Sequence, residues 1–313
     1  MKGLIVTPAR RRNTFYDHYI CLFEKIKEKL GFDILYVNKL KVPSDIDVVI
    51  THAVPQRTYG NALMGLAALD KNVKLIGYLH DLHPFDDEGY RERMIEMLNR
   101  YDVVLTDREE LLKKYFPEYS SKIVFFPNFF APHTRYANFE FNEKPILKCL
   151  LSGFSDKREG SQIYPLRSFI FNNIDRSKAV IIPHPGPASS REEMLADKRY
   201  YIGDRYAKKL HSYFCCLATS SKFDIMLVRY PEIPATGSLL IANEVADLKK
   251  AGFVSGEHYI SITEKNALEV IYECLDNPDK YTEIRRNGME FVRRNHSISN
   301  RFKQLKKILG ELV

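Results

Sequence analysis

The feature that most constrains the fold is a regular alternation of short apolar runs with longer amphipathic segments. Helical patterns, such as those at about 15–30 and 91–99, separate the runs in the first part of the chain. Strands that alternate with helices imply parallel sheets joined by right-handed crossovers. We therefore expect an α/β protein. The apolar runs of this part are 4–6, 33–37, 48–50, 74–79, 103–105 and 123–126.

A polar, proline-containing stretch at about 132–145 interrupts the alternation, which then restarts with a strand at 147–151. Further strands are expected at 180–182, 216–218 and 239–241. A chain of 313 residues can form two domains of ordinary size. We predict two αβ lobes with a boundary near residue 145. Ligands of such open sheets bind at the carboxyl ends of the strands.

Composition bounds the setting of the protein. Hydrophobic residues make up 45% and charged residues 28%, as is usual for a globular protein in water. No apolar run approaches the roughly 20 residues that span a bilayer. The five cysteines are scattered without zinc spacing, so a reduced, cytoplasmic location is expected. The net charge of +7 fits an anionic substrate, an anionic membrane or nucleic acid, and does not choose among them.

The segment 224–243 carries the clearest chemistry. Asp224 and Glu232 lie eight residues apart and are followed by Gly237 and an apolar run. A helix that begins near Glu232 would direct its free N–H groups at a ligand, and Gly237 would allow a close approach. This arrangement suits a nucleotide sugar, with the ribose on Glu232 and the diphosphate at the helix end. An ordinary helix–strand unit with a surface acid is the alternative.

Several cations follow the strand ends of the second lobe. Gly153 comes after the first strand of this lobe and precedes Lys157 and Arg158, while Arg167 and Arg205 lie on later loops or early helical turns. Arginine and lysine side chains at such positions can clamp a diphosphate. Solvation at the surface is the alternative for each residue singly. Their shared placement after strand ends favours anion binding.

Candidates in the first lobe are less specific. His80 and Asp81 follow the strand at 74–79, where Asp81 could act as a general base or orient a histidine. A helix cap is the alternative. A metal site would need a third ligand, for which the acids at 86–88 are near enough in sequence, but it is not the expected reading. The basic turn at 10–12 could hold an anionic acceptor or be a solvated cluster. The chain has no GxGxxG after its first strand and no GxxxxGK[ST] motif.

Taken in order, several of these motifs resemble the GT-B glycosyltransferases, and most closely the spore-maturation glycosyltransferase-like group. The matching runs are YPLR at 164–167, YIG at 201–203, EIPATG at 232–237 and NH at 295–296. The resemblance implies two Rossmann-like αβα lobes facing a central cleft. It further implies an acceptor-side lobe over 1–145, a nucleotide-sugar-binding lobe over 146–294 and a helix over 295–313 that crosses back to the first lobe.

The resemblance also implies roles for residues. Glu232 would bind the ribose hydroxyls, Thr236 and Gly237 would face the diphosphate, Gly203 would lie against the base and Asp81 in the acceptor site. Asp224 stands where the family has a longer Glu, which departs from the pattern. The candidate catalytic residues are His80, Asp81 and Asp224, and the donor-binding candidates are Gly153, Arg158, Arg167, Gly203, Arg205, Tyr206, Arg229, Glu232, Thr236 and Gly237.

The function so implied is transfer of a hexose or pentose from a UDP- or GDP-sugar to a hydroxyl of a glycan or small molecule. No metal or cofactor is expected, because fixed cations and helix N–H groups can stabilise the leaving diphosphate. Two alternatives stay open: another enzyme on this fold, such as a sugar-nucleotide epimerase or a phosphorylase, and a nucleic-acid-binding module. Nucleic acid is not the expected partner, because the aromatic residues suit core packing. The amphipathic end at 301–309 is expected to dock on the protein, with peripheral membrane contact as the alternative.

Overall fold

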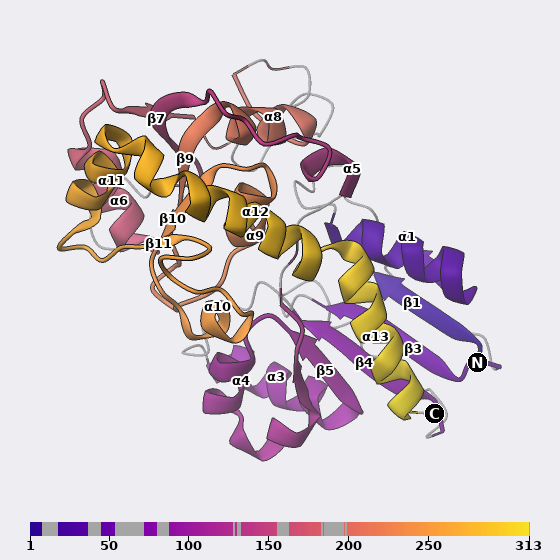
Figure 1. Cartoon of the computed structure of the whole chain (residues 1–313). Helices are drawn as coiled ribbons and strands as arrows, with labels where there is room; N and C mark the ends of the chain where they lie inside the picture. Colours follow the sequence, from indigo (N-terminus) through magenta and orange to yellow (C-terminus); the bar gives the residue numbers. More distant parts are fainter. Residues whose placement is uncertain are drawn as a thin grey trace. The chain divides into compact units, whose positions relative to one another are not determined.

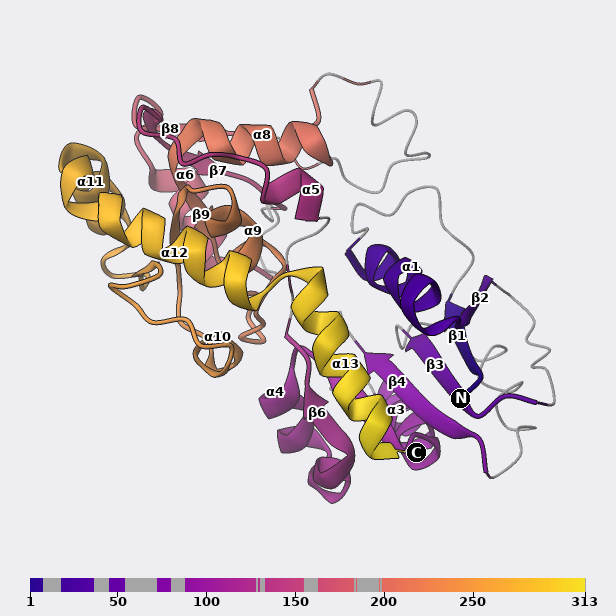
Figure 2. The same cartoon turned by 45° about the vertical axis from the view of Figure 1, so that its right-hand side comes forward.

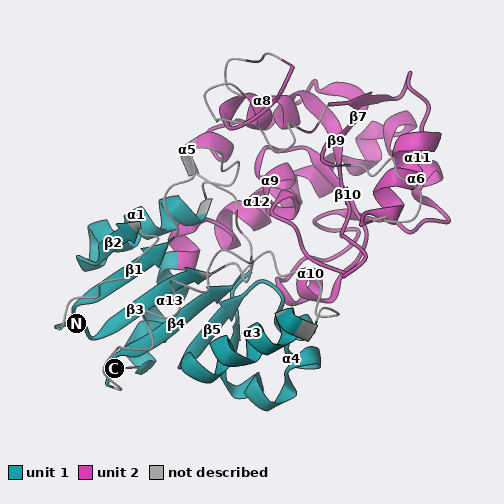
Figure 3. Ribbon diagram, turned by 180° about the vertical axis from the view of Figure 1, so that it is seen from behind, with its two compact units in different colours: residues 1–11, 19–127, 302–313 teal, residues 12–18, 128–301 magenta. Residues whose placement is uncertain are grey.

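A computed structural model of the chain describes residues 1–7, 18–36, 45–53, 72–79, 88–127, 129, 133–154, 163–182, 184, 197 and 199–312. The helix expected at 61–69 and the basic turn at 10–12 lie outside these ranges. Contacts divide the chain into two compact units, shown in Figure 3, with residues 1–11, 19–127 and 302–313 in the first and 12–18 and 128–301 in the second. The functional bounds expected from the sequence, 1–145, 146–294 and 295–313, stay a prediction.

The first unit is built on a parallel sheet with the strand order β2-β1-β3-β4-β5-β6. Helix α1 covers one face of this sheet and α3 the other, as Figures 1 and 3 show. The strand bounds are β1 Gly3–Thr7, β2 Asp33–Tyr36, β3 Val48–Ala53, β4 Lys74–Leu79, β5 Val103–Thr106 and β6 Ile123–Phe125. The helices described here are α1 His18–Leu30, α3 Glu88–Arg100, α4 Glu109–Tyr115 and the 3₁₀ turn η1 Pro117–Lys122.

The second unit has a parallel sheet with the order β11-β10-β9-β7-β8. Read from β8, this order repeats β2-β1-β3-β4-β5 of the first sheet, so the two units share one topology. The predicted α/β class with two parallel sheets is confirmed. The bounds are β7 Ile146–Leu151, β8 Ala179–Ile181, β9 Tyr213–Ala218, β10 Leu239–Ala242 and β11 Ile260–Ser261. The helical segments are α5 His133–Tyr136, α6 Pro165–Asn173, α8 Asp204–Ser212, α9 Arg229–Ala235, α10 Ala246–Lys250, α11 Ala267–Asp276, η2 Pro278–Tyr281 and α12 Thr282–Asn295.

Side-chain alternation along the strands gives the second sheet two buried faces. Leu150 and Leu240 pack with residues of α8, α9 and α12, whereas Cys149 and Ile241 pack with residues of α6 and α11. Successive side chains of a strand point to opposite faces, so strands covered on both sides are apolar throughout. This pattern explains why the run Tyr213–Ala218 is wholly buried.

Helix α12 is tied to the end of α9 by arginines. Arg285 donates from Nε to the Gly237 carbonyl at 3.1 Å, and Arg293 donates from Nε to the Ala235 carbonyl at 3.0 Å. Gly288 permits the close packing of α12, because a Cβ at this position would lie 2.5 Å from the His258 carbonyl oxygen. The carbonyls at the end of α9 are therefore satisfied by side chains of α12.

His296 follows α12 and is held as a neutral ring. Its Nε2 donates to the Ala251 carbonyl at 3.0 Å, and its Nδ1 accepts from Arg301 at 2.8 Å. Burial and the adjacent Arg301 charge lower the pKa of His296 from 6.5 to about 3. The two hydrogen bonds require the unprotonated ring, so protonation would break the contact with Arg301.

We expect the free energy of unfolding to fall as the pH is lowered below 6.5, because the pKa of His296 is depressed in the folded state. Its contribution is complete above pH 6.5 and is lost as the pH falls towards about 3. The loss at about pH 5.5 relative to about pH 7.5 is about 1.4 kcal/mol. Chemical denaturation at the two pH values measures it. His296→Gln should be less stable at the higher pH but less pH-dependent, and an unchanged pH dependence would contradict the assignment to His296.

The C-terminal helix α13 spans Ile298–Leu312, and its residues from 302 onwards belong to the first unit. Leu305 and Leu309 are buried, Lys306 and Lys307 are exposed, and Gln304 donates to the Phe125 carbonyl at 2.7 Å. Figure 2 shows this helix beside the strands of the first sheet. Its apolar side thus packs on the protein. Within the described ranges, no helix is both long and apolar enough to span a bilayer.

Candidate functional site

The strand order identifies where a ligand site is expected in the second unit. After β7 the chain first adds β8 on one side and then adds β9 on the other. Crevices at such switch points, outside the carboxyl ends of the strands, are the usual ligand sites of open parallel sheets. Ser152 and Gly153 follow β7, and Thr219 follows β9. The candidate site is therefore built around these three residues.

Gly153 and Arg229 lie against each other at the end of β7. Gly153 has φ +101°, and a Cβ added to it would lie 2.4 Å from Nη1 of Arg229. Nη1 of Arg229 also donates to the Ser152 carbonyl, and lies 3.4 Å from the Ser152 hydroxyl. Only glycine satisfies both the left-handed backbone and the space that the guanidinium occupies. The predicted residues Gly153 and Arg229 are thus brought together.

Tyr206 joins this group from the first turn of α8. Its hydroxyl lies 2.9 Å from the Ser152 hydroxyl. Enclosure of the hydroxyl raises the pKa of Tyr206, against the opposing effect of Arg229 and with a smaller effect of Glu232. These effects show that Tyr206, Arg229 and Glu232 share one electrostatic environment. Tyr206 is consequently a neutral hydrogen-bonding group at ordinary pH.

Glu232 lies in the middle of α9 with only 9% of its surface exposed. Tyr136, on α5, lies near enough for the charge of this carboxylate to act on its hydroxyl. Burial and the negative charge of Glu232 raise the pKa of Tyr136 well above its ordinary value, so the tyrosine stays a donor. A nearly buried carboxylate is costly unless it is paired and hydrogen-bonded. The surroundings of Glu232 therefore include the neutral Tyr136 hydroxyl.

Arg167, which the sequence suggests as a diphosphate ligand, is 1% exposed and connects two strand ends. Its Nη2 donates to the Thr219 carbonyl at 2.7 Å, and its Nη1 donates to the Phe154 carbonyl at 2.9 Å. Its guanidinium also lies 4.0 Å from the ring centre of Tyr164. These contacts fix the loops after β7 and β9 on either side of the switch point. Arg167 thus holds the loops after β7 and β9 in place at the edge of the site.

His184 follows β8 and lies near Arg229 and Arg167, although the sequence motifs do not point to it. Its ring meets that of Phe154 edge to face, with 6.2 Å between the centroids. Partial burial lowers the pKa of His184, and the positive charges of Arg229 and Arg167 lower it further. The end of β7 is therefore a region of positive potential, which favours an anionic ligand.

The helix expected to begin near Glu232 begins instead at Arg229, and Pro234 lies inside it. Thr236 and Gly237 follow its C-terminal end and are buried. The Thr236 hydroxyl donates to the Ile233 carbonyl at 2.7 Å, and Gly237 has φ +82° with its N–H bonded to Pro234 at 2.8 Å. Thr236 and Gly237 end the helix and turn the chain into β10, which is a common role of a glycine with positive φ.

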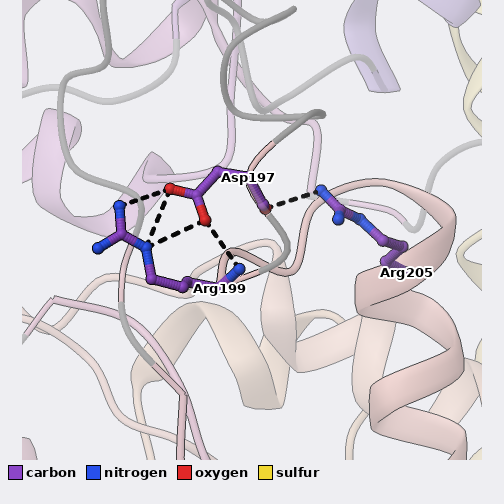
Figure 4. Close-up of polar contacts among 3 residues, drawn as sticks. All are labelled: Asp197, Arg199 and Arg205. Carbon is purple, nitrogen blue, oxygen red and sulfur yellow. Dashed lines mark hydrogen bonds and ion pairs between the residues drawn. The ribbon is translucent and has the colours of Figure 1, made fainter.

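Gly203 and Arg205 lie at the start of α8. Gly203 has φ +56°, and its nearest side-chain neighbour is Arg135, which pairs with Asp204 at 2.7 Å. Arg205 reaches the carbonyl oxygen of Asp197 at 3.4 Å, while Arg199 binds the carboxylate of Asp197, as Figure 4 shows. No described contact joins Arg205 to Glu232 or Arg229. The start of α8 and the residues just before it thus carry the ion pairs Arg135–Asp204 and Arg199–Asp197.

Of the remaining candidates, one lies within the described residues and three lie outside them. Asp224 is exposed and occupies a turn with φ 52°, a conformation that Asp tolerates better than most residues. His80, Asp81 and Arg158 lie outside the described residues. Across the described ranges, no group of three or more His, Cys, Asp or Glu side chains is arranged to hold a metal ion.

Four residues of the site are missing from the candidates that the sequence supplies: Ser152, Tyr136, His184 and Thr219. Ser152 could have been found from its place directly after β7 and before Gly153. Tyr136 gives no such signal, because it lies in the polar stretch between the two alternating patterns. Glu232 lies 96 positions further along the chain, and only folding brings the two residues near each other.

Comparisons with known proteins agree with this architecture. Residues 186–307 match a family model described as glycosyl transferase-like. An α-glucosyltransferase in complex with UDP and a DNA 13-mer has a TM-score of 0.66 at 14% identity, covering 99% of this chain and 100% of its own. The Anabaena protein HepE in complex with UDP and glucose has a TM-score of 0.64 at 11% identity, with coverages of 99% and 100%.

Sucrose-phosphate synthase from Thermosynechococcus elongatus has a TM-score of 0.67 at 13% identity, covering 100% of this chain and 99% of its own. In sequence, no curated protein matches the chain. The fold is that of the GT-B glycosyltransferases, and the predicted resemblance to them is confirmed. The narrower likeness to the spore-maturation group stays a prediction.

Proposed function

We propose that the protein transfers a hexose or pentose from a UDP- or GDP-sugar to a hydroxyl of a glycan or small molecule. The observation that carries this proposal is that a nearly buried carboxylate, Glu232, and the cation Arg229 both act on the Tyr206 hydroxyl beside the strand end at Ser152. A carboxylate can accept both hydroxyls of a ribose, and a guanidinium matches the oxygens of a diphosphate. The solved relatives in complex with UDP support this class of donor.

In this proposal Glu232 binds the ribose hydroxyls and Arg229 binds the diphosphate, with Arg158 as a further cation. Transfer breaks the bond between the anomeric carbon and the diphosphate oxygen, so negative charge grows on the leaving group. A fixed cation at that point stabilises the transition state and needs no metal or cofactor. The Ser152 and Tyr206 hydroxyls are hydrogen-bonded to each other at 2.9 Å, which leaves one hydroxyl proton of the pair to donate to the diphosphate. Asp224 is exposed, and this scheme assigns it no role.

The acceptor is assigned to the first lobe, where His80 and Asp81 follow β4. Asp81 would take the proton of the attacking hydroxyl, alone or through His80. Gly203 is assigned to contact with the nucleotide base. Thr236 and Gly237 are assigned to support of the chain segment that would hold the donor. A cytoplasmic location and a peripheral membrane contact through the exposed lysines of α13 belong to the same set of proposals.

The test is a screen of thermal stabilisation with UDP, GDP, ADP and their common sugar conjugates, followed by calorimetric titration of the best ligand. A nucleotide present at about 100 times its Kd should stabilise the protein by about 2.7 kcal/mol. Failure of every nucleotide to stabilise the chain, together with salt-sensitive RNA binding, would favour the nucleic-acid module. Conversion of a nucleotide sugar without any acceptor would identify an epimerase instead.

A further inference from the structure

Phe154 presents an exposed aromatic ring one residue beyond the glycine that Arg229 lies against. It is the one aromatic member of the exposed large hydrophobic side chains in the described ranges, and 47% of its surface is accessible. We propose that Phe154 is a specificity-determining residue, whose ring stacks on the C–H face of the sugar that the donor carries. This inference rests on the proposed function, because it takes the donor to be a nucleotide sugar whose diphosphate lies beside Arg229.

Two arginines hold the backbone that carries this ring. Nη1 of Arg167 donates to the Phe154 carbonyl at 2.9 Å, and the Arg167 side chain is itself buried. Gly153, the preceding residue, has φ +101° and lies directly against the guanidinium of Arg229. A side chain on a fixed backbone has less freedom to lose when a ligand covers it, so more of the contact energy appears as affinity.

An aromatic neighbour limits the orientation of the ring. His184, which follows β8, meets the ring of Phe154 with 6.2 Å between the centroids and 83° between the ring planes. This edge-to-face arrangement is one of the favoured geometries of two aromatic rings. The ring of Phe154 is still partly in solvent with His184 in place, so it can take a second partner from the solvent side.

The position of the ring selects the part of the donor that it can contact. Base, ribose, diphosphate and sugar follow one another in a nucleotide sugar. Under the proposed function the diphosphate is bound by Arg229, whose Nη1 donates to the Ser152 carbonyl. Phe154 is two residues beyond Ser152, and consecutive Cα atoms are about 3.8 Å apart, so its ring is within reach of the group attached to the diphosphate. That group is the transferred sugar.

The chemistry of a sugar ring suits an aromatic surface. A pyranose carries its hydroxyls mostly at the rim, whereas C–H groups cover much of at least one face. The face of a phenyl ring is the negative part of its quadrupole, so it attracts polarised C–H groups while both apolar surfaces leave water. The substrate class that Phe154 selects is therefore a pyranose with an uninterrupted C–H face.

The experiment compares a nucleotide with its sugar conjugate by calorimetric titration of the wild type and Phe154→Ala. The conjugate is whichever of UDP-glucose, UDP-galactose, UDP-N-acetylglucosamine and GDP-mannose the wild type binds most tightly, and the nucleotide is the matching UDP or GDP. The ratio of the conjugate's affinity to that of the nucleotide should fall about fivefold in Phe154→Ala, since the sugar alone loses a stacking partner. Phe154→Trp should keep the wild-type ratio, because its ring also has a flat face.

Leu147→Ala is the matched control, because Leu147 is 52% exposed near the opposite, amino-terminal end of β7. Its affinity ratio should equal that of the wild type. Phe154→Leu separates stacking from simple apolar contact, since leucine keeps an apolar side chain without a flat ring, and its ratio should also fall. Melting temperatures should be the same in all of these variants, because the substituted side chains are exposed.

Three results would overturn the inference. An equal loss of affinity for nucleotide and conjugate in Phe154→Ala would mean that the ring contacts the base or only supports the loop. An unchanged ratio would mean that the sugar does not touch the ring, and a wild-type ratio in Phe154→Leu would mean that no stacking takes place. In each of these cases the wild type still binds its nucleotide, so the proposed function survives. A wild type that binds neither the nucleotides nor their conjugates would reject the proposed function, and the inference with it.

Discussion

Glu232→Gln should weaken UDP binding at least about 100-fold, because two ribose hydroxyls lose a charged acceptor and each such bond contributes about 1.5–3 kcal/mol. The catalytic efficiency of transfer should fall by at least the same factor, because the ribose is held in the ground state and in the transition state alike. Calorimetric titration and steady-state kinetics measure the two effects. This is the largest change that we expect from a single substitution.

The fold should survive this substitution. Glutamine has nearly the shape of glutamate, and it removes the charge of a side chain that is only 9% exposed. Neutral isosteres of buried charges are often tolerated in proteins. Glu269→Gln, an exposed change on α11, provides the control with unaltered affinity. Wild-type affinity in a folded Glu232→Gln protein would remove Glu232 from the site.

Arg229→Met should weaken UDP binding about 30-fold, because the diphosphate loses a charge-assisted hydrogen-bonding partner that contributes about 2 kcal/mol. Uridine lacks the diphosphate, so its affinity should change little. Arg229→Lys should give an intermediate loss, since lysine keeps the charge but not the planar fork. Titration with uridine, UMP and UDP measures where along the ligand the affinity is lost.

Arg229 also donates to the Ser152 carbonyl, so its loss could disturb the loop after β7. Such a disturbance would weaken uridine and UDP together, and that result would contradict the assignment of Arg229 to the diphosphate. Arg286→Met is the matched control, because Arg286 is exposed on α12 and pairs with Glu143. Its UDP affinity should equal that of the wild type.

The local patterns in the sequence predict the architecture well. Apolar runs such as Leu239–Ala242 are buried on both faces, and a strand of this kind needs a parallel sheet with helices on either side. The restart of the alternation after about residue 145 indicates a second sheet before any contact is known. These features are local, so they can be read from neighbouring residues.

The details of the site depend on contacts that local patterns do not contain. Arg167 has the sequence context of an anion ligand, yet it donates hydrogen bonds to Thr219 and Phe154. Thr219 lies 52 positions away along the chain, and Phe154 lies in the loop after β7, so no local pattern predicts either contact. The start of α9 was harder to predict because Pro231 and Pro234 both suggest helix starts, while the helix begins at Arg229. The nearness of Glu232 and Arg229 follows from their spacing of three on one helix.

The repeated strand order of the two sheets has a consequence for the diversity of this fold. Each half carries its own switch point, and under the proposed function one half recognises the nucleotide and the other the acceptor. Loops at one switch point can therefore change without disturbing the residues that surround Glu232. A chimaera that joins this second half to a foreign first half should inherit its nucleotide preference from one parent and its acceptor from the other.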